Sequence, residues 1–174
     1  MNFRAVIFDL DGVIVCTDRF HYQAWKETVE GLGISFDEEM NNRLRGVGRM
    51  ESLEILLEYG GNRSFSREEK EKLAAQKNEI YRGLLAAMTP DDVTEEVRDT
   101  LAEIRRRGYG ICLGSSSRNA EYILERTGLK EAFDRIVDGN QIKKSKPDPE
   151  VFLKGAALLG EKPEDCLVVE DAEA

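Results

Sequence analysis

Short apolar runs that each end in polar residues are the feature that most restricts how this chain can fold. They cover residues 4–8, 110–114, 134–138 and 166–170. Runs of this length, rich in branched aliphatic side chains and bounded by polar residues, predict strands that are buried on both faces of a sheet. Helical patterns separate these runs. Strands that alternate with helices in this way predict right-handed crossovers and a parallel sheet.

The segments between the runs show helical spacing of their apolar residues. Before the second run, one helical face is formed by Val93, Val97, Leu101 and Ile104. Asp148 followed by Pro149 is typical of a helix N-terminus, where an N-cap residue precedes a proline at the first helical position. The apolar face of that helix continues at Phe152, Ala156 and Leu159. We therefore expect an α/β fold with a Rossmann-like core.

The stretch from residue 16 to residue 89 has a different character, because it lacks a strand-like apolar run. Ser66 and Glu69 have the spacing of a capping box, which marks the N-terminus of a helix. Apolar stripes at helical spacing are formed by Trp25, Val29, Leu32, Leu73, Ile80 and Leu84. We therefore predict an all-α domain over 16–89, inserted into a discontinuous core that comprises 1–15 and 90–174.

The chain has 174 residues and a net charge of −9, from 25 Lys and Arg against 34 Asp and Glu. A length of this order suits one domain that carries an insertion. The acidic balance argues against nucleic acid or an acidic membrane as a partner, since both require a basic surface. The apolar runs are too short to span a membrane, and the 3 cysteines form no Cys-x-x-Cys pair. We expect a cytoplasmic protein whose cysteines are small apolar core residues.

Polar side chains follow each predicted strand, at the edge where ligands gather in a parallel α/β sheet. They are Asp9 and Asp11, then Ser115, Ser116 and Ser117, then Lys146, and finally Glu170 and Asp171. Carboxylates that converge from two strands suit Mg²⁺, which prefers oxygen ligands. Hydroxyl and ammonium groups suit a bound phosphoryl group, and a carboxylate beside a metal can act as a nucleophile. The pattern therefore indicates phosphoryl-transfer chemistry.

Each of these groups taken singly also has an ordinary structural interpretation. Aspartates are common in turns at strand ends, and serines are common in loops. Lys146 is also compatible with a solvated surface side chain, and Glu170 with Asp171 is compatible with a plain acidic surface. It is the order of the groups along the chain that favours one shared site.

This order and spacing resemble the four motifs of the haloacid dehalogenase superfamily over nearly the whole chain. The matching residues are Asp9-Leu10-Asp11-Gly12, Ser115, Lys146 and Glu170-Asp171. The resemblance implies that Asp9 attacks phosphorus as the nucleophile and that Asp11 is the general acid and base. It implies that Ser115 and Lys146 hold the transferring phosphoryl group. The Mg²⁺ ligands that it implies are Asp9, the Asp11 backbone carbonyl, Glu170 and Asp171.

The predicted helical domain resembles the cap domain of the β-phosphoglucomutases within that superfamily. The matching segments are Thr17, His21, Ala24-Trp25-Lys26, Arg45-Gly46-Val47-Gly48-Arg49, Glu51-Ser52-Leu53, Lys77-Asn78 and, in the core, the phosphate-binding loop Ser115–Asn119. The resemblance implies a Mg²⁺-dependent phosphomutase that interconverts β-D-glucose 1-phosphate and glucose 6-phosphate. The reaction would pass through an aspartyl-phosphate and β-glucose 1,6-bisphosphate, which serves as the activating intermediate.

A mutase must also bind a second phosphate away from the metal. The Arg49 guanidinium suits this task because it grips phosphate with two hydrogen bonds. The resemblance implies catalytic roles for Thr17 and His21, with His21 setting the proton transfer of Asp11 when the cap closes. The substrate contacts that it implies are Trp25, Arg49, Ser52, Lys77, Ser115, Ser116, Arg118 and Asn119.

The helical domain residues have structural interpretations too. His21 is the single histidine of the chain, and a lone histidine on a helix is usually structural or exposed. Trp25 suits packing first and substrate contact second. Lys77 shares a stripe with Leu73 and Ile80, where a lysine that extends its ammonium into solvent is common.

Two departures from the family pattern affect these expectations. Cys16 stands where such enzymes carry an acidic residue, and the sequence stops at Ala174, directly after the fourth motif. We therefore expect a truncated core that lacks its last strand and helices, with the strand that ends at Glu170 as an exposed sheet edge.

Two rival functions remain open at this point. The first is a sugar phosphatase of the same superfamily, and the second is an inactive remnant that binds a sugar phosphate or a protein. The choice of sugar and the pathway partner are also open. The resemblance implies a monomer that acts on a small sugar phosphate.

Overall fold

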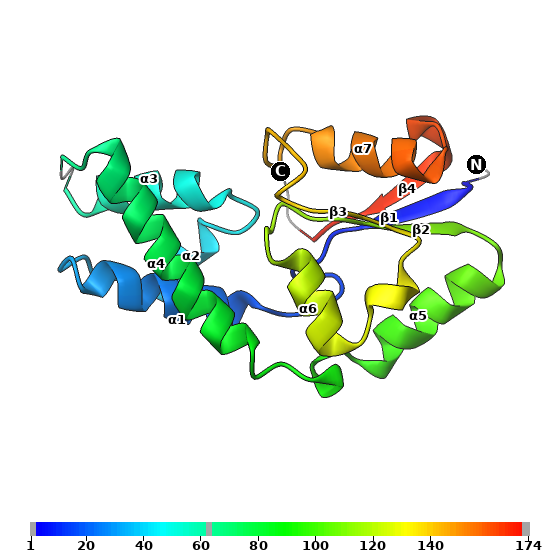
Figure 1. Ribbon diagram of the computed structural model, residues 1–174, viewed down its shortest axis with the longest axis horizontal. Helices are drawn as coiled ribbons and strands as arrows, with labels where there is room; N and C mark the ends of the chain where they lie inside the picture. The colour runs from blue at the N-terminus through cyan, green and yellow to red at the C-terminus, as the bar shows by residue number, and fades with distance from the viewer. Residues whose placement is uncertain (1–2, 62–63, 172–174) are drawn as a thin grey trace. The chain divides into compact units, whose positions relative to one another are not determined.

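The computed structural model describes residues 3–61 and 64–171, and these residues form two compact units (Figure 1). The sheet unit comprises Met1–Cys16 and Met88–Ala174, and the helical unit comprises Thr17–Ala87. Residues 172–174, on which the expectation about the end of the core falls, lie outside the described residues.

In the part of the chain that the structure describes, the sheet unit contains a parallel sheet of four strands in the order β3-β2-β1-β4. The strands are β1 (Ala5–Phe8), β2 (Gly110–Gly114), β3 (Arg135–Val137) and β4 (Cys166–Val169). Each lies within one of the apolar runs that predict a strand. The expectation of a parallel α/β fold is therefore confirmed.

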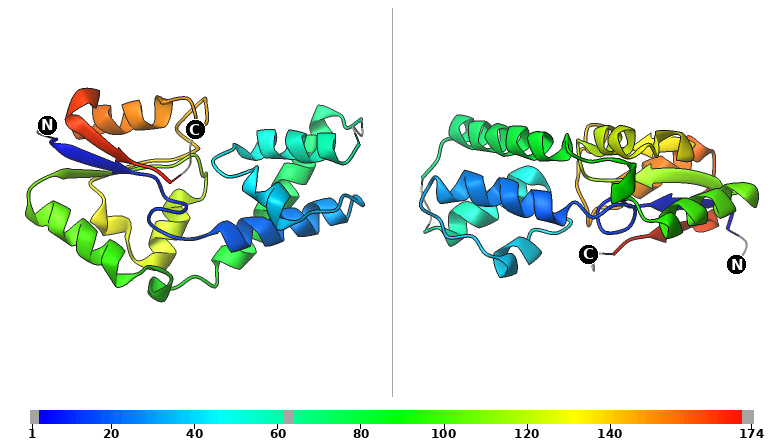
Figure 2. Two further views of the ribbon diagram at one scale, coloured as in Figure 1. Left: turned by 180° about the vertical axis from the view of Figure 1, so that it is seen from behind. Right: turned by 90° about the horizontal axis from the view of Figure 1, so that it is seen from below.

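Helices cover both faces of this sheet (Figures 1 and 2). Helix α7 (Glu150–Leu159) packs against β1, β2 and β3 on one face. On the opposite face lie α5 (Glu95–Arg106), which packs against β2, and α6 (Ala120–Thr127). The apolar core beneath α7 consists of Ile7, Cys112, Val137, Val151 and Ala156.

The N-terminus of α7 lies one residue later than the sequence pattern predicts, because Pro149 takes the N-cap position. The predicted capping residue still performs its task. The Asp148 carboxylate accepts a hydrogen bond of 3.0 Å from the Glu150 backbone N–H, which satisfies a donor that the helix itself leaves unpaired.

The strand order places β1 and β4 side by side at a topological switch point. The chain passes from β1 to β2 through α5 on one face, whereas it passes from β3 to β4 through α7 on the other. Phe8 of β1 is in register with Val169 of β4 and with Leu113 of β2. The residues that follow these strands are therefore neighbours at the carboxyl edge, where α/β sheets bind ligands.

Strand β4 lies at one edge of the described sheet, as expected. Its two central side chains are partly open to solvent, with 40% of Leu167 and 41% of Val168 exposed. The edge strand is thus less covered than β1, in which every residue is buried.

The helical unit contains α1 (Asp18–Glu30), α2 (Glu38–Asn42), α3 (Arg49–Tyr59) and α4 (Arg67–Leu85). The predicted capping box is confirmed, because the Ser66 side chain accepts from the Glu69 N–H and the Glu69 side chain accepts from the Ser66 N–H. The core of this unit includes Trp25, Val29, Ile34, Phe36, Met40, Leu44, Leu53, Leu56, Leu57 and Ala74.

The buried face of α4 differs from the predicted stripe. Leu73, Ile80 and Leu84 are only half-buried, whereas the buried side chains are Ala74, Lys77, Tyr81 and Leu85. The pattern misled because a lysine occupies the middle of the buried face. Lys77 does not extend into solvent: its side chain is enclosed, and the whole residue is 3% exposed.

None of the described helices is both long enough and apolar enough to cross a membrane. The cysteines are free thiols. The prediction that they fill the core is confirmed for Cys112, where burial raises the pKa of the thiol to about 12. It is wrong for Cys16, which is exposed because it lies in the segment that leaves the sheet.

Candidate active site

Asp9 directly follows β1 and lies at the carboxyl edge of the sheet. Its backbone N–H donates to the Val169 carbonyl of β4 at 2.9 Å, so the sheet ladder fixes its position. The residue is 6% exposed. A carboxylate in such a place requires a partner, because an unpaired buried charge is costly.

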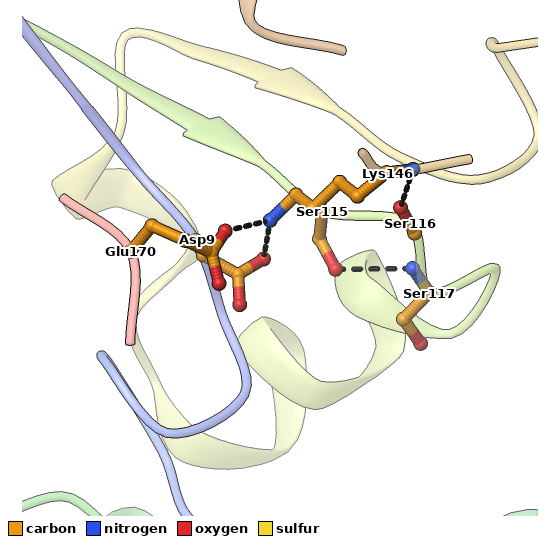
Figure 3. A network of polar contacts seen from close by, with 6 residues as sticks. All are labelled: Asp9, Ser115, Ser116, Ser117, Lys146 and Glu170. Atoms are coloured by element: carbon orange, nitrogen blue, oxygen red, sulfur yellow. Dashed lines mark hydrogen bonds and ion pairs between the residues drawn. The ribbon is translucent and has the colours of Figure 1, made fainter. Parts of the chain in front are cut away.

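That partner is Lys146, which lies on the loop between β3 and α7 and is 7% exposed. Its ammonium is 2.5 Å from Asp9 Oδ1 and 2.5 Å from Glu170 Oε2 (Figure 3). The same ammonium lies 4.7 Å from the centre of the Phe152 ring of α7. Phe152 was predicted only as part of an apolar face, and no sequence signal indicated this contact.

The surroundings of Asp9 shift the pKa of its carboxyl in opposite directions. Burial is the main influence and raises the pKa of the Asp9 carboxyl, and the nearby Glu170 carboxylate raises it further. The Lys146 ammonium acts in the other direction through its charge and its hydrogen bond. Lys146 thus favours the ionised form of Asp9, which is the form able to attack phosphorus.

Three carboxylates meet beside this pair. Asp9, Glu170 and Asp171 each offer an oxygen, and these atoms lie within 4.8 Å of one another. Opposite ligands of one Mg²⁺ ion are separated by about 4.2 Å, and the ion prefers such hard oxygen donors. The residues present therefore fit a small divalent cation. The cluster does not include the carboxylate of Asp11, whose expected contribution is its backbone carbonyl.

The loop after β1 is tightly folded and leaves room for this cluster. The Ile14 N–H donates to the Leu10 carbonyl and the Gly12 N–H to the Val15 carbonyl, which brings Asp11 into a bridge with Val15. Gly12 has a φ of 88°, in the left-handed region. A Cβ atom at Gly12 would overlap with the Asp171 carboxylate, so only glycine lets that side chain approach.

The serine loop, residues Ser115–Ser117, follows β2 at the same edge of the sheet. Ser115 is 1% exposed, and its Oγ accepts from the Ser117 N–H at 3.1 Å. The Ser116 Oγ accepts from the Lys146 N–H at 3.4 Å, which ties this loop to the lysine segment (Figure 3). Beyond it, Arg118 is exposed and Asn119 is a buried N-cap of α6.

The helical unit assembles a second group around a lysine and a histidine. The Lys77 ammonium is 2.9 Å from Nδ1 of His21. It also lies 4.4 Å from the centre of the Tyr81 ring and 5.0 Å from the centre of the Trp25 ring. The aromatic faces and the imidazole nitrogen together replace the water that the ammonium loses on burial.

This contact fixes the tautomer of His21. An ammonium group is only a donor, so Nδ1 of His21 must accept and the ring proton must lie on Nε2. Burial, and then the positive charges of Lys77 and Arg49, lower the pKa of His21 well below 6.5. His21 is therefore a neutral ring whose Nε2–H is a donor.

The other expected residues of the helical unit are buried or half-buried. Thr17 is fully buried, and its Oγ1 accepts from the Tyr81 hydroxyl at 3.2 Å. Ser52 and Trp25 are each 2% exposed, and the Ser52 hydroxyl faces the Val47 carbonyl at 3.5 Å. Arg49 is half-buried at the first position of α3.

Tyr81 is the residue of this unit that sequence reasoning missed. It lies one turn after Lys77 on the same face of α4, contacts Thr17, and has its ring centre 4.2 Å from that of His21. That helical spacing from Lys77 was the available signal.

The expected site residues thus fall into two sets, each in a different unit. The sheet unit brings together Asp9, Lys146, Glu170, Asp171, Ser115 and Ser116. The helical unit brings the expected residues Thr17, His21, Trp25 and Lys77 together with Tyr81, which was not expected, and its Arg49 lies close enough to influence His21.

Comparison with known proteins identifies the family. A family model described as a haloacid dehalogenase-like hydrolase matches residues 3–174. The β-phosphoglucomutase of Bacillus subtilis strain 168 is 44% identical over 172 residues, which are 98% of this chain and 76% of that protein. A phosphorylated carbohydrates phosphatase of Thermotoga maritima is 30% identical over 173 residues, 98% of this chain and 77% of that protein.

A solved structure agrees with this result. The crystal structure of β-phosphoglucomutase from Clostridium difficile superposes with a TM-score of 0.93 at 40% identity and covers 98% of this chain and 77% of that one. Sequence, fold and the buried Asp9–Lys146 pair lead to the same assignment. The chain belongs to the haloacid dehalogenase-like hydrolase family.

Proposed function

We propose that this protein is a Mg²⁺-dependent β-phosphoglucomutase that interconverts β-D-glucose 1-phosphate and glucose 6-phosphate. The observation that carries the proposal is the buried Asp9 carboxylate, paired with Lys146 beside the serine loop and the acidic pair Glu170 and Asp171. The likeness to two β-phosphoglucomutases, at 44% and 40% identity, supports the choice of a mutase.

In the proposed reaction Asp9 carries the phosphoryl group between two oxygens of the sugar. From an aspartyl-phosphate at Asp9, the 6-hydroxyl of β-glucose 1-phosphate attacks phosphorus while Asp11 takes its proton. This step gives β-glucose 1,6-bisphosphate and frees the Asp9 carboxylate. Asp9 Oδ then attacks the phosphorus of the 1-phosphate group. The bond from this phosphorus to O1 breaks, and Asp11 returns the proton to O1. Glucose 6-phosphate leaves.

The neighbouring residues stabilise the charge that moves in these steps. Lys146 offsets the charge of Asp9 and of the phosphoryl oxygens, and the Ser115 hydroxyl donates to the phosphoryl group. Mg²⁺ held by Asp9, the Asp11 carbonyl, Glu170 and Asp171 would neutralise negative charge on the transferring phosphoryl group. The proposal needs no proton transfer to His21.

The distal phosphate of the bisphosphate requires cations outside this centre. We assign it to Arg49, because a guanidinium binds phosphate through two hydrogen bonds. In the helical unit His21 offers a neutral N–H and Lys77 a buried positive charge. We propose that the protein acts on small sugar phosphates as a cytoplasmic monomer.

The second candidate function is a sugar phosphatase, which the Thermotoga maritima relative supports. The two functions differ only in the acceptor of the phosphoryl group on Asp9, a sugar hydroxyl or water. The test incubates the protein with β-glucose 1-phosphate, Mg²⁺ and a trace of β-glucose 1,6-bisphosphate, and follows glucose 6-phosphate and free phosphate together. An Asp9→Asn variant is the matched control.

We expect glucose 6-phosphate as the main product of the wild type and no product from the variant. Rapid release of free phosphate without glucose 6-phosphate would exclude the mutase and leave the phosphatase. No turnover of this or other sugar phosphates by the wild type would leave only a binding role.

A further inference from the structure

The turn that follows β3, residues Asp138–Asn140, lies against the serine loop and is used by no step of the proposed reaction. Asp138 is 5% exposed, although it carries a charge. Its two carboxylate oxygens accept from Asn140, one from the backbone N–H and one from the side-chain amide, each at 2.9 Å. The Asp138 carboxylate thus holds the turn in place at the end of β3.

The same turn is bonded to the segment after β2 by two contacts. The Asn140 amide donates to the Arg118 carbonyl at 3.1 Å, and the Gly139 N–H donates to the Ser117 carbonyl at 3.1 Å. The Ser115 N–H donates to the Val137 carbonyl at 2.9 Å. The hydrogen bonds between β2 and β3 therefore continue into the contacts between the turn and the serine loop. The backbone that carries the serines is therefore held along its length by the segment after β3.

Gly139 allows the close approach of the two segments. A Cβ atom at this position would overlap with the Ser116 carbonyl and would press on the side chain of Arg118. Because the obstacle is backbone, any larger residue must push the serine loop away. The contact thus links the identity of residue 139 to the position of Ser116.

The position of Ser116 matters because its hydroxyl accepts from the Lys146 N–H. A displacement of the serine loop would therefore move the Ser115 hydroxyl and, through Ser116, the segment that carries the Lys146 ammonium. These are the two groups proposed to hold the phosphoryl group. Catalytic donors must be held within a fraction of an ångström, since a misplacement of about 1 Å can lower a rate by about a hundredfold.

We propose that the Asp138–Asn140 turn is a positioning element that sets the serine loop for phosphoryl binding, with Gly139 and Asn140 as its decisive residues. This inference rests on the proposed function only in that the serine loop binds a phosphoryl group. It holds equally for a mutase and for a phosphatase, because both bind the same group at Asp9.

The experiment compares three variants with the wild type. Asn140→Ala removes the bonds to Asp138 Oδ2 and to the Arg118 carbonyl, and Gly139→Ala introduces the overlap with Ser116. Gln141→Ala is the matched control, because Gln141 is the next residue and is exposed, and its side-chain amide donates to the Ile136 carbonyl of β3. The probe is inorganic phosphate, titrated by calorimetry in the presence of Mg²⁺, together with kcat, KM and the melting temperature.

We expect the affinity for inorganic phosphate and kcat to fall about tenfold in Asn140→Ala and further in Gly139→Ala, with KM rising as the phosphate affinity falls. Gln141→Ala should match the wild type. Equal loss of melting temperature in all variants with unchanged kcat would show a merely structural turn.

Unchanged phosphate affinity and kcat in both variants would overturn the inference while leaving the proposed function intact. A wild type that binds no phosphate and turns over no sugar phosphate would overturn both. The two failures are therefore distinguishable.

Discussion

At the scale of single residues, the behaviour of this site depends on one buried ammonium between two carboxylates. Lys146 contacts Asp9 and Glu170, while the ring of Phe152 covers it. Removal of one partner from a buried ion pair costs more than the pair contributes, because the other charge stays buried and alone. Lys146 is therefore expected to affect both stability and catalysis.

Replacement of Lys146 by methionine tests this expectation. With Mg²⁺ chelated, Lys146→Met should lower the free energy of unfolding at pH 7 by about 3 kcal/mol, measured by urea denaturation. With Mg²⁺ present, kcat should fall about a hundredfold or more. Lys144→Met is the control, since Lys144 is exposed and pairs only at the surface with Asp148. Equal effects of the two substitutions would contradict the role given to Lys146.

His21 gives a prediction on pH dependence that can be isolated, because it is the single histidine of the chain. Lys77, Arg49 and the ring of Tyr81 face it, and its pKa in the folded protein is well below 6.5. As pH falls below about 6.5, His21 takes up a proton in the unfolded chain but stays neutral in the folded protein. The free energy of unfolding must therefore fall on acidification.

The measurement is the difference in melting temperature between pH 7.5 and pH 5.5, for the wild type and for His21→Gln. The wild type should lose more stability on acidification than the variant, since the variant lacks the group that titrates. The same loss in both proteins would show that the pKa of His21 is not lowered.

At the scale of elements, the sequence best predicts the features that depend on residues close together in the chain. The four strands lie within the predicted runs, and the Ser66–Glu69 capping box forms as its spacing indicates. Both depend on nearby residues. The buried face of α4 was predicted wrongly, because the burial of Lys77 depends on His21 and Trp25, which come from another helix.

The same distinction applies to the candidate site. The motifs placed Asp9, Lys146 and Glu170 at one edge of the sheet, and the structure joins these side chains. The turn at Asp138–Asn140 could not be predicted, since its importance lies in a contact with the loop after β2 that no local pattern encodes.

The capping box of α4 provides a prediction at this scale. Ser66→Ala removes the hydroxyl that accepts from the Glu69 N–H and should lower the free energy of unfolding by about 1 kcal/mol. Ser64→Ala is a matched control, because Ser64 is an exposed serine outside the helix. Chemical denaturation measures both. An equal, small effect of the two changes would show that the cap contributes nothing.

At the scale of the whole molecule, the net charge of −9 is reconciled with an anionic substrate by local arrangement. Part of the acidic excess is gathered into the cluster of Asp9, Glu170 and Asp171, which two adjacent parallel strands build at the switch point of the sheet. A divalent cation there, together with the Lys146 ammonium, offsets the negative charge of these three carboxylates. Activity is thus expected to depend on metal, although no single residue decides it.

Removal of metal tests this dependence. Treatment with EDTA should abolish turnover, and added Mg²⁺ should restore it. Asp171→Asn should raise the Mg²⁺ concentration needed for half-maximal rate about tenfold, because one charged ligand becomes neutral. Asp165→Asn, before β4, should leave the requirement unchanged. Full activity of the wild type in EDTA would contradict the assignment of the cluster.

In the proposed function Asp9 carries the phosphoryl group and passes it to a sugar. The most direct measurement mixes the protein with β-glucose 1,6-bisphosphate bearing radiolabelled phosphate, quenches in acid within one turnover, and locates the label by peptide mapping. Label is expected on the peptide that contains Asp9, and it should pass to the sugar when unlabelled β-glucose 1-phosphate is added. Label that never appears on that peptide, or that passes only to water, would contradict the proposed function.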